Sequence, residues 1–164
     1  MRIISGQLKG KKLFHPKDKK TRPLKDLVKE SIFNIIHHSK KFNLKLENSN
    51  ILDLFSGIGS FGIEALSRGA NSVTFVENYL NVYEILIRNI KLNKLENKSV
   101  IIKKDILNEL NFKKIKQSFE IIFLDPPYKE EISSIISKIY ESKILKKDGV
   151  LIMHRHSSQN DFFL

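Results

Sequence analysis

Residues 51–62 read Ile51-Leu52-Asp53-Leu54-Phe55-Ser56-Gly57-Ile58-Gly59-Ser60-Phe61-Gly62, and this stretch decides the fold. A mostly apolar run ends in a glycine-rich turn, and an amphipathic segment follows it. Gly57, Gly59 and Gly62 give the spacing G-x-G-x-x-G between a predicted strand and a predicted helix, as in dinucleotide-binding folds. The pattern predicts a nucleotide-type ligand at the carboxyl end of this strand.

Short apolar strands and amphipathic helices alternate from this turn to the end of the chain. The predicted strands are 51–55, 72–77, 99–103, 119–124 and 149–154. Helices are predicted near 60–68, stopped by Gly69, near 79–92 with Asn78 as its N-cap, and near 130–142. Such alternation gives right-handed crossovers and a doubly wound, mainly parallel α/β sheet whose ligand crevice lies at the carboxyl ends of the strands.

The first 50 residues have a different pattern and a different charge. Residues 2–15 are predicted to form a small twisted ribbon broken by glycine, and a helix follows with Thr21 as cap and Pro23 in its first turn. Residues 1–50 hold 13 Lys and Arg against 4 Asp and Glu, while residues 51–164 hold 16 against 14. This asymmetry favours an arm that meets polyphosphate, with a lysine-rich solvated surface as the alternative.

Composition excludes several classes of protein. A chain of 164 residues with 41% hydrophobic positions is long enough for one globular domain with a hydrophobic core. We expect residues 51–164 to form the catalytic domain and residues 1–50 to form a basic extension. The absence of cysteine excludes disulfide scaffolds and thiolate metal sites. No run approaches the ~20 apolar residues of a membrane helix, and Met1-Arg2-Ile3-Ile4-Ser5-Gly6 is unlike a signal peptide, so a cytoplasmic protein is expected. A monomer is a separate expectation.

Two histidines near the carboxyl end raise the question of a metal. His154 and His156 lie two residues apart, so on a strand they share a face. Zinc sites need further ligands, and no third one is evident in the sequence. A solvated or RNA-facing edge is therefore the preferred interpretation, and no metal is predicted.

The ligand at the glycine turn has two interpretations. Glu77 ends the second strand of the predicted sheet, where a carboxylate accepts both hydroxyls of a ribose. NAD and NADP fit this geometry, and so does S-adenosylmethionine, which has a ribose and adenine but no pyrophosphate. Only 112 residues run from Asp53 to the end, too few for two mononucleotide-binding halves and a substrate domain. Chain length therefore favours S-adenosylmethionine.

The tetrapeptide Asp125-Pro126-Pro127-Tyr128 follows the strand 119–124 directly. An exocyclic amine of a nucleobase is a poor nucleophile because its lone pair is delocalised into the ring. The Asp125 carboxylate and the Pro126 carbonyl can each accept one N–H bond, which turns the lone pair toward a sulfonium methyl group. Tyr128 offers an aromatic face on which an extruded base stacks. These residues predict methyl transfer to a nucleobase amine.

Six stretches carry a resemblance to a known family: Arg2-Ile3-Ile4-Ser5-Gly6 with Lys9-Gly10, Thr21-Arg22-Pro23, Val28-Lys29-Glu30-Ser31-Ile32-Phe33-Asn34, Asp53-Leu54-Phe55-Ser56-Gly57-Ile58-Gly59, Glu64-Ala65-Leu66-Ser67-Arg68-Gly69-Ala70 and Asp125-Pro126-Pro127-Tyr128. Together they resemble the RsmD family of bacterial 16S ribosomal RNA guanine-N2 methyltransferases. The resemblance implies the Rossmann-like class I S-adenosylmethionine-dependent methyltransferase fold.

The resemblance also implies roles for individual residues. Asp53 and the turn from Phe55 through Gly57 to Gly59 would line the methionine part of S-adenosylmethionine. Glu77 would hold the ribose, and Asp105 with the Ile106 backbone would meet adenine. Asp125, Pro126 and Tyr128 would present guanine N2. The cations that would grip 16S ribosomal RNA in the small subunit or its assembly intermediate are Arg2, Lys9, Lys11, Lys12 and Arg22.

Two alternatives to this function stay open. A DNA adenine-N6 methyltransferase uses the same tetrapeptide but normally adds a target-recognition domain. A noncatalytic RNA-binding protein with a methyltransferase-like fold would account for the basic arm. Class I sheets usually end in an antiparallel hairpin, and the ten residues after His154 are too few for it, so this hairpin is expected to be short or missing.

Overall fold

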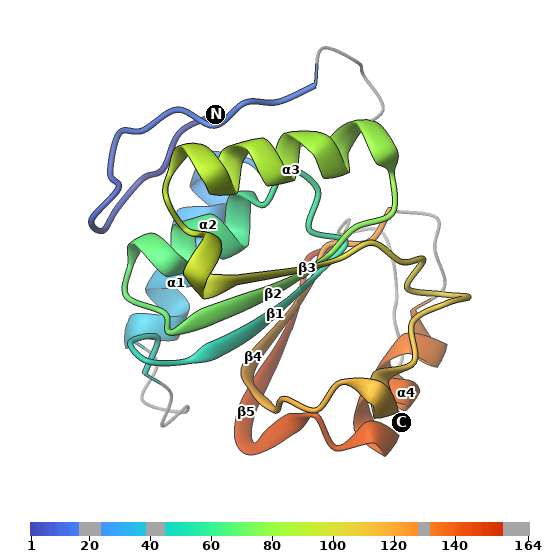
Figure 1. The fold of residues 1–164 in the computed structure, drawn as a ribbon. Coiled ribbons are helices and arrows are strands. Elements are labelled where there is room, and N and C mark those ends of the chain that lie inside the picture. Colours follow the sequence, from blue (N-terminus) through green and yellow to red (C-terminus); the bar gives the residue numbers. More distant parts are fainter. Residues whose placement is uncertain (17–23, 39–44, 128–131, 156–164) are drawn as a thin grey trace.

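Helices cover both faces of one five-stranded parallel sheet (Figure 1). The computed structural model describes residues 1–16, 24–38, 45–127 and 132–155. The strands are β1 Asn50–Leu54, β2 Ser72–Val76, β3 Ser99–Ile102, β4 Phe119–Leu124 and β5 Leu145–Met153. The helices are α1 Asp26–His38, α2 Ser60–Ser67, α3 Leu80–Leu92 and α4 Ser133–Ser142, with short 3-10 turns at Glu96–Lys98 and Phe112–Lys114.

The sheet order is β3-β2-β1-β4-β5, and every pairing of neighbouring strands is parallel. β1 is central, with β2 on one side and β4 on the other. The predicted doubly wound, mainly parallel sheet is therefore confirmed, and its first four strands fall within one residue of the predicted bounds. Among the described residues there is no antiparallel hairpin beyond β5, and residues 156–164 lie outside them.

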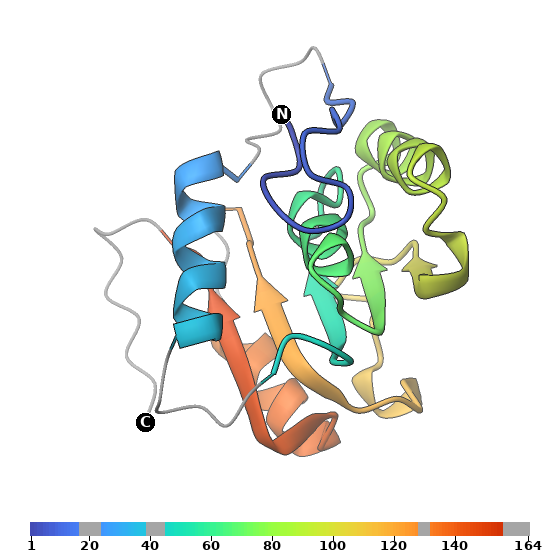
Figure 2. The ribbon, with the colours of Figure 1, turned by 90° about the vertical axis from the view of Figure 1, so that its left-hand side faces the viewer.

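Both faces of the sheet are covered, which explains why its strands are mainly apolar. Helices α1, α2 and α3 pack on one face and α4 on the other (Figure 2). Side chains alternate between the faces along each strand. Ile51 in β1 points into the α1–α3 layer, whereas Leu52 and Leu54 point toward α4.

The glycine turn after β1 requires glycine at two of its positions. Gly59 has a φ of 82°, in the left-handed region that disfavours other residues. Gly62 lies in α2 where that helix crosses β2, and an added Cβ would come within 2.3 Å of the Phe75 ring. The third glycine of the motif therefore sets the close approach of helix to strand.

The N-terminal ribbon, residues 1–14, folds back on itself and packs on α2 and α3 (Figure 1). Arg2 and Lys12 form one antiparallel bridge, and the Ile3 N–H donates to the Lys11 carbonyl at 2.9 Å. The predicted ribbon is confirmed, but as a single bridge between two extended segments. Ile3 and Leu13 are buried in the same hydrophobic cluster as the α1–α3 face of the sheet.

An aromatic stack ties α1 to the sheet. The ring centroids of Phe33 and Phe61 lie 5.0 Å apart, and those of Phe61 and Phe123 lie 3.9 Å apart, both pairs nearly parallel. Phe33 belongs to α1, Phe61 to α2 and Phe123 to β4. The helix from the basic N-terminal segment is thus part of the main core. None of the described helices has the length and apolarity to cross a bilayer.

Two details differ from the sequence-based expectations. β5 begins at Leu145 and not near residue 149, because a register shift opposite Phe119–Ile121 takes up the extra residues. Helix α3 starts after Tyr79, and the expected Asn78 cap is wrong. Thr21 and Pro23, the expected start of the first helix, lie outside the described residues.

Candidate functional site

The sheet order brings the predicted functional residues to one edge. Asp53 near the end of β1, Glu77 just after β2 and Asp125 just after β4 follow three adjacent strands. Because these strands are parallel, their carboxyl ends meet at the same edge, where open α/β sheets bind ligands. The carboxylates of Glu77 and Asp125 both influence the titration of Asp53.

Glu77 organises the backbone around this edge. Its Oε2 accepts the N–H of Gly57 at 2.8 Å, and its Oε1 accepts the N–H groups of Asn78 and Tyr79 at 2.9 and 2.8 Å. Glu77 therefore fixes the backbone that leads from β2 into α3, before the first residue of that helix. A carboxylate has about four acceptor positions. Three are occupied, which leaves about one direction for a ligand hydroxyl.

Asp53 is a buried carboxyl group with one free oxygen. Its Oδ2 accepts the Gly62 N–H at 3.1 Å, while its Oδ1 is buried and has no partner. Burial raises the pKa of Asp53 well above its ordinary value; the Gly62 bond opposes the shift, and the nearby Asp125 and Glu77 carboxylates add to it. A cationic group placed against Oδ1 would relieve this cost.

The turn between Asp53 and α2 leaves room beside its backbone. Phe55 and Gly57 have φ values of 57° and 55°, and the Ser56 hydroxyl and N–H both bond the Val76 carbonyl. A Cβ added to Gly57 would meet no atom within 4 Å. The open side of the turn therefore lies at Gly57, whereas Gly59 is packed against the Leu86 side chain.

Asp125 is held at the end of β4 with part of its carboxylate accessible. Its backbone N–H donates to the Leu54 carbonyl at 3.3 Å, and its side chain is 23% exposed. Burial raises the pKa of Asp125, and a hydrogen bond from His154 opposes the rise. Pro126 is buried, and this burial restricts the orientation of the Pro126 carbonyl, the second proposed acceptor. Tyr128 lies outside the described residues.

Asp105 and Ile106 follow β3, one strand further along the sheet. The Asp105 Oδ1 accepts the Leu107 N–H at 2.8 Å and the Asn108 N–H at 3.2 Å, so this carboxylate closes its own turn. Ile106 is buried in the cluster on the α4 face. A contact of these residues with adenine stays a prediction.

Three polar residues make contacts in and around this region that the sequence analysis did not predict. His154, expected at a solvated edge, bonds Asp125 Oδ1 through Nδ1 at 2.8 Å. Asn89 in α3 accepts the Phe14 N–H at 2.8 Å and donates to the carbonyls of Phe14 and Ile58 at 3.0 Å. It thereby joins the N-terminal ribbon to the glycine turn. The third residue is Glu64.

Glu64 in α2 is a buried hub for the N-terminal segment. It accepts the N–H groups of Ile4 and Ser5 at 2.8 and 2.9 Å and the Arg68 Nε–H at 2.8 Å. The Lys29 ammonium of α1 lies 3.5 Å from the Glu64 carboxylate, and both side chains are 0% exposed. The sequence signal was the motif Glu64-Ala65-Leu66, whose role only the fold reveals.

The predicted RNA-binding cations lie on the ribbon surface. Lys9, Lys11 and Lys12 are exposed, and the Arg2 side chain is 73% exposed. Arg2 faces Lys12 directly across the antiparallel bridge, and the Asp26 carboxylate, 4.0 Å from Arg2 Nε, offsets part of the repulsion between these two like charges. A hollow of about 410 Å³ beneath the ribbon is lined by Arg2, Lys9, Glu30, Asn34 and Arg68 among others. Arg22 lies outside the described residues.

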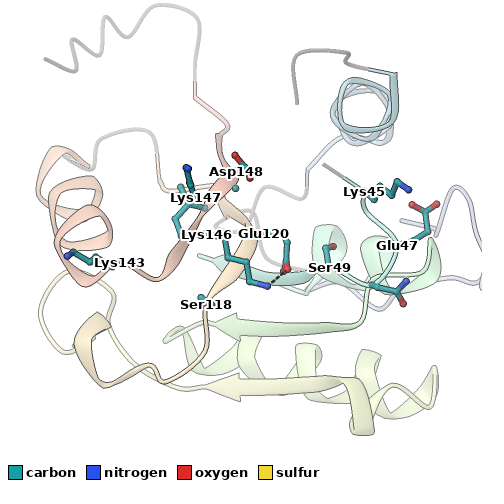
Figure 3. Close-up of a pocket in the computed structure, with 12 residues that line it drawn as sticks. Lys45, Glu47, Ser49, Ser118, Glu120, Lys143, Lys146, Lys147 and Asp148 are labelled. Carbon is teal, nitrogen blue, oxygen red and sulfur yellow. Dashed lines mark hydrogen bonds and ion pairs between the residues drawn. The ribbon is translucent and has the colours of Figure 1, made fainter. Parts of the chain in front are cut away.

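A larger cavity of about 900 Å³ lies at the opposite edge of the sheet (Figure 3). It opens at the amino ends of β1, β4 and β5. Glu120 bonds Lys146 and accepts the Asn50 N–H at 2.7 Å, and these two bonds outweigh burial, so the pKa of Glu120 is lowered. This cavity therefore surrounds a contact that joins three strands, and it is remote from the carboxylates of the candidate site.

Within the described ranges, no group of three or more His, Asp or Glu side chains is placed to hold a metal ion. His154 is bonded to Asp125, and His156 lies outside the described residues. The candidate site consists of its carboxylates, the glycine turn and His154.

Comparisons with known proteins agree with this geometry. The family Conserved hypothetical protein 95 matches residues 1–162. The Bacillus subtilis protein YlbH, provisionally named an rRNA methyltransferase, is 37% identical over 93% of this chain and 80% of its own length. Ribosomal RNA small subunit methyltransferase D of Haemophilus influenzae is 33% identical over 92% of this chain and 76% of its own.

A solved structure extends the comparison to the fold. The Escherichia coli protein yhhF, provisionally named a methyltransferase, superposes with a TM-score of 0.82 and 26% identity. The match covers 100% of this chain and 85% of the other. The five-stranded parallel sheet is therefore that of solved methyltransferases.

Proposed function

The chain belongs to the family Conserved hypothetical protein 95 and is similar to ribosomal RNA small subunit methyltransferase D, and from this premise we propose that it methylates ribosomal RNA with S-adenosylmethionine. Its proposed target is the exocyclic N2 of a guanine in 16S ribosomal RNA of the small subunit. The observation that carries the proposal is the meeting of Asp53, Glu77 and Asp125 at one sheet edge. At that edge the glycine turn, proposed to bind the cofactor, lies beside Asp125, the first residue of the tetrapeptide proposed to present the base.

The residues of the site fit the proposed cofactor. The buried, unpartnered Asp53 Oδ1 suits the ammonium group of the methionine part, and the space beside Gly57 admits its backbone contact. Glu77 keeps about one acceptor direction for the ribose. When bound, S-adenosylmethionine supplies an electrophilic methyl group on a sulfonium centre. Its ammonium and sulfonium cations suit an edge that carries three carboxylates better than a dinucleotide pyrophosphate would.

The chain's own residues would prepare the nucleophile. Asp125 Oδ2 and the Pro126 carbonyl would each accept one N–H of guanine N2, which localises the nitrogen lone pair. As N2 bonds to the methyl carbon, the S–C electron pair stays on sulfur and one proton leaves N2. That proton goes either to Asp125 or to solvent, and the Asp125→Asn variant separates the two. Tyr128 is proposed to stack on the base.

The RNA contact is proposed for the N-terminal segment, residues 1–50, with residues 51–164 carrying catalysis. The four exposed cations of the ribbon, Arg2, Lys9, Lys11 and Lys12, support it, because cations gathered on one surface attract phosphate groups. Arg22 is proposed to join them. Asn89 provides a physical connection from this ribbon to the glycine turn.

The direct test is methylation of small ribosomal subunits from cells that lack the gene. Purified protein and S-adenosylmethionine should add one methyl group to one guanine, located by mass spectrometry of 16S ribosomal RNA digests. Asp125→Ala should lower the rate by about 10²- to 10³-fold with RNA binding kept, because a preorganised transition-state contact is lost. Asp125→Asn should be intermediate if Asp125 only orients the amine, and as slow as Ala if it is the base.

A methyl group found on DNA adenine in parallel reactions would overturn the RNA assignment. Full activity in Asp125→Ala would overturn the assignment of the site.

A further inference from the structure

His154 is placed at the candidate site by the register of the last two strands. Leu124 pairs with Met153, and the His154 N–H donates to the Leu124 carbonyl at 2.9 Å. The same backbone contact sets the imidazole beside Asp125, with Nδ1 at 2.8 Å from Oδ1. The two side chains are 26% and 23% exposed, so the pair lies at the mouth of the site.

We propose that His154 is a positioning residue for Asp125: its Nδ1–H holds one carboxylate oxygen in place and leaves the other directed at the substrate amine. This inference rests on the proposed function, because it assigns His154 a part in the same methyl transfer. It names a residue outside the Asp125-Pro126-Pro127-Tyr128 tetrapeptide that the chemistry uses.

The physical reason lies in the ionisation state and the orientation that the proposed role requires of the Asp125 carboxylate. As an orienting acceptor, Asp125 accepts most strongly when it is ionised, and it must present one oxygen in a constant direction. Burial at the end of β4 favours the protonated form of Asp125, and the His154 bond favours the carboxylate. A donor on Oδ1 also stops rotation about the terminal side-chain bond, so Oδ2 keeps one orientation.

An ionised Asp125 can only accept a hydrogen bond, so the contact with it places a proton on His154 Nδ1. A neutral imidazole that donates from Nδ1 carries its lone pair on Nε2, and an imidazolium donates from both nitrogens. Either form supplies the Nδ1–H that the proposal needs. The other charged groups at the carboxyl ends of the strands in the described residues are Asp53 in β1, Glu77 after β2, Lys103, Lys104 and Asp105 after β3, and Arg155 next to His154. None of them is altered by a substitution at His154.

The experiment compares two substitutions of similar size. His154→Asn keeps an N–H donor near the position of Nδ1, whereas His154→Leu removes it. Single-turnover methylation should be slowed about 10-fold or more in His154→Leu, the effect of a charged hydrogen bond discounted for its exposure. His154→Asn should stay within about threefold of wild type. The KM for RNA and the affinity for S-adenosylhomocysteine should not change, since His154 is assigned no contact with either.

The pH profile gives a readout that a structural role would not move. Without the His154 donor the pKa of Asp125 rises, so the acid limb of the rate in His154→Leu should shift to higher pH, and in His154→Asn it should shift less. Titration of the Asp125 carboxyl carbon by NMR in the full chain should show the same order. This titration does not depend on activity.

Glu141→Leu is the control, because Glu141 is exposed in α4, outside the proposed RNA-binding segment and the candidate site, and its replacement should change neither readout. Wild-type rates and an unshifted Asp125 titration in His154→Leu would overturn the positioning role while leaving the proposed function intact. If wild-type protein methylates no RNA, the proposed function fails, and the Asp125 titration still decides whether His154 holds the carboxylate ionised. An equal loss of rate in the Asn and Leu variants would also contradict the proposal.

Discussion

Replacing Glu64 by Ala should detach the N-terminal ribbon and destabilise the whole chain. The substitution leaves the Lys29 ammonium fully buried, with the Arg2 carbonyl at 3.1 Å and the Asp26 carboxylate at 3.8 Å as its remaining partners. It also removes the acceptor from the N–H groups of Ile4 and Ser5. Breaking one side of a buried ion pair costs about 3–5 kcal/mol.

This loss is a large part of the total stability of a domain, about 5–15 kcal/mol. Urea unfolding of the full chain, followed by far-UV circular dichroism because the sequence has no Trp, measures it. With an m-value of about 2 kcal/mol/M, the midpoint should fall by roughly 2 M. Amide hydrogen exchange at Ile4 and Ser5 should accelerate in the same variant, which locates the change at the ribbon.

Two further variants test the cause. Glu84→Ala removes an exposed carboxylate from α3 and should change stability by less than about 0.5 kcal/mol. The double variant Lys29→Met with Glu64→Gln removes both buried charges and should recover much of the loss, because no unpaired ion stays in the core. A Glu64→Ala variant that loses less than about 1 kcal/mol and keeps the protection of Ile4 and Ser5 would refute the reasoning.

Asp53→Asn should raise the melting temperature of the free protein at neutral pH and weaken S-adenosylhomocysteine binding, both measurable by thermal shift. The expected rise in melting temperature follows from the raised pKa of Asp53. Folding disfavours the ionised carboxylate, so Asp53 lowers the free energy of unfolding once the pH exceeds its pKa in the unfolded chain, and Asn removes this penalty. Gly62→Ala should destabilise the chain by about 1–3 kcal/mol in chemical unfolding, since its Cβ overpacks the helix against β2. Neutralising Lys9, Lys11 and Lys12 together should lower the slope of log K against log salt for RNA by about 2 to 3 and leave cofactor affinity unchanged; an unchanged slope would show that they contact no phosphate.

The local elements of the fold follow from the sequence because their signals are local. The sequence predicts the strand 119–124 with its observed bounds, since an apolar run that only Glu120 interrupts is typical of a strand buried on both faces. Gly62 is needed by the packing of its own helix. Asp53, Glu77 and Asp125 could be placed at one edge because parallel strands share the direction of their ends.

Contacts between side chains distant in the sequence were decided only by the tertiary structure. His154 meets Asp125 across 29 positions because β5 pairs with β4 in one particular register, and its strand start is shifted by an irregularity that the sequence pattern does not mark. Glu64 meets Ile4 across 60 positions because the ribbon crosses α2 at its buried face. A sequence pattern fixes which face a residue occupies, whereas the partner on that face depends on how separate elements dock.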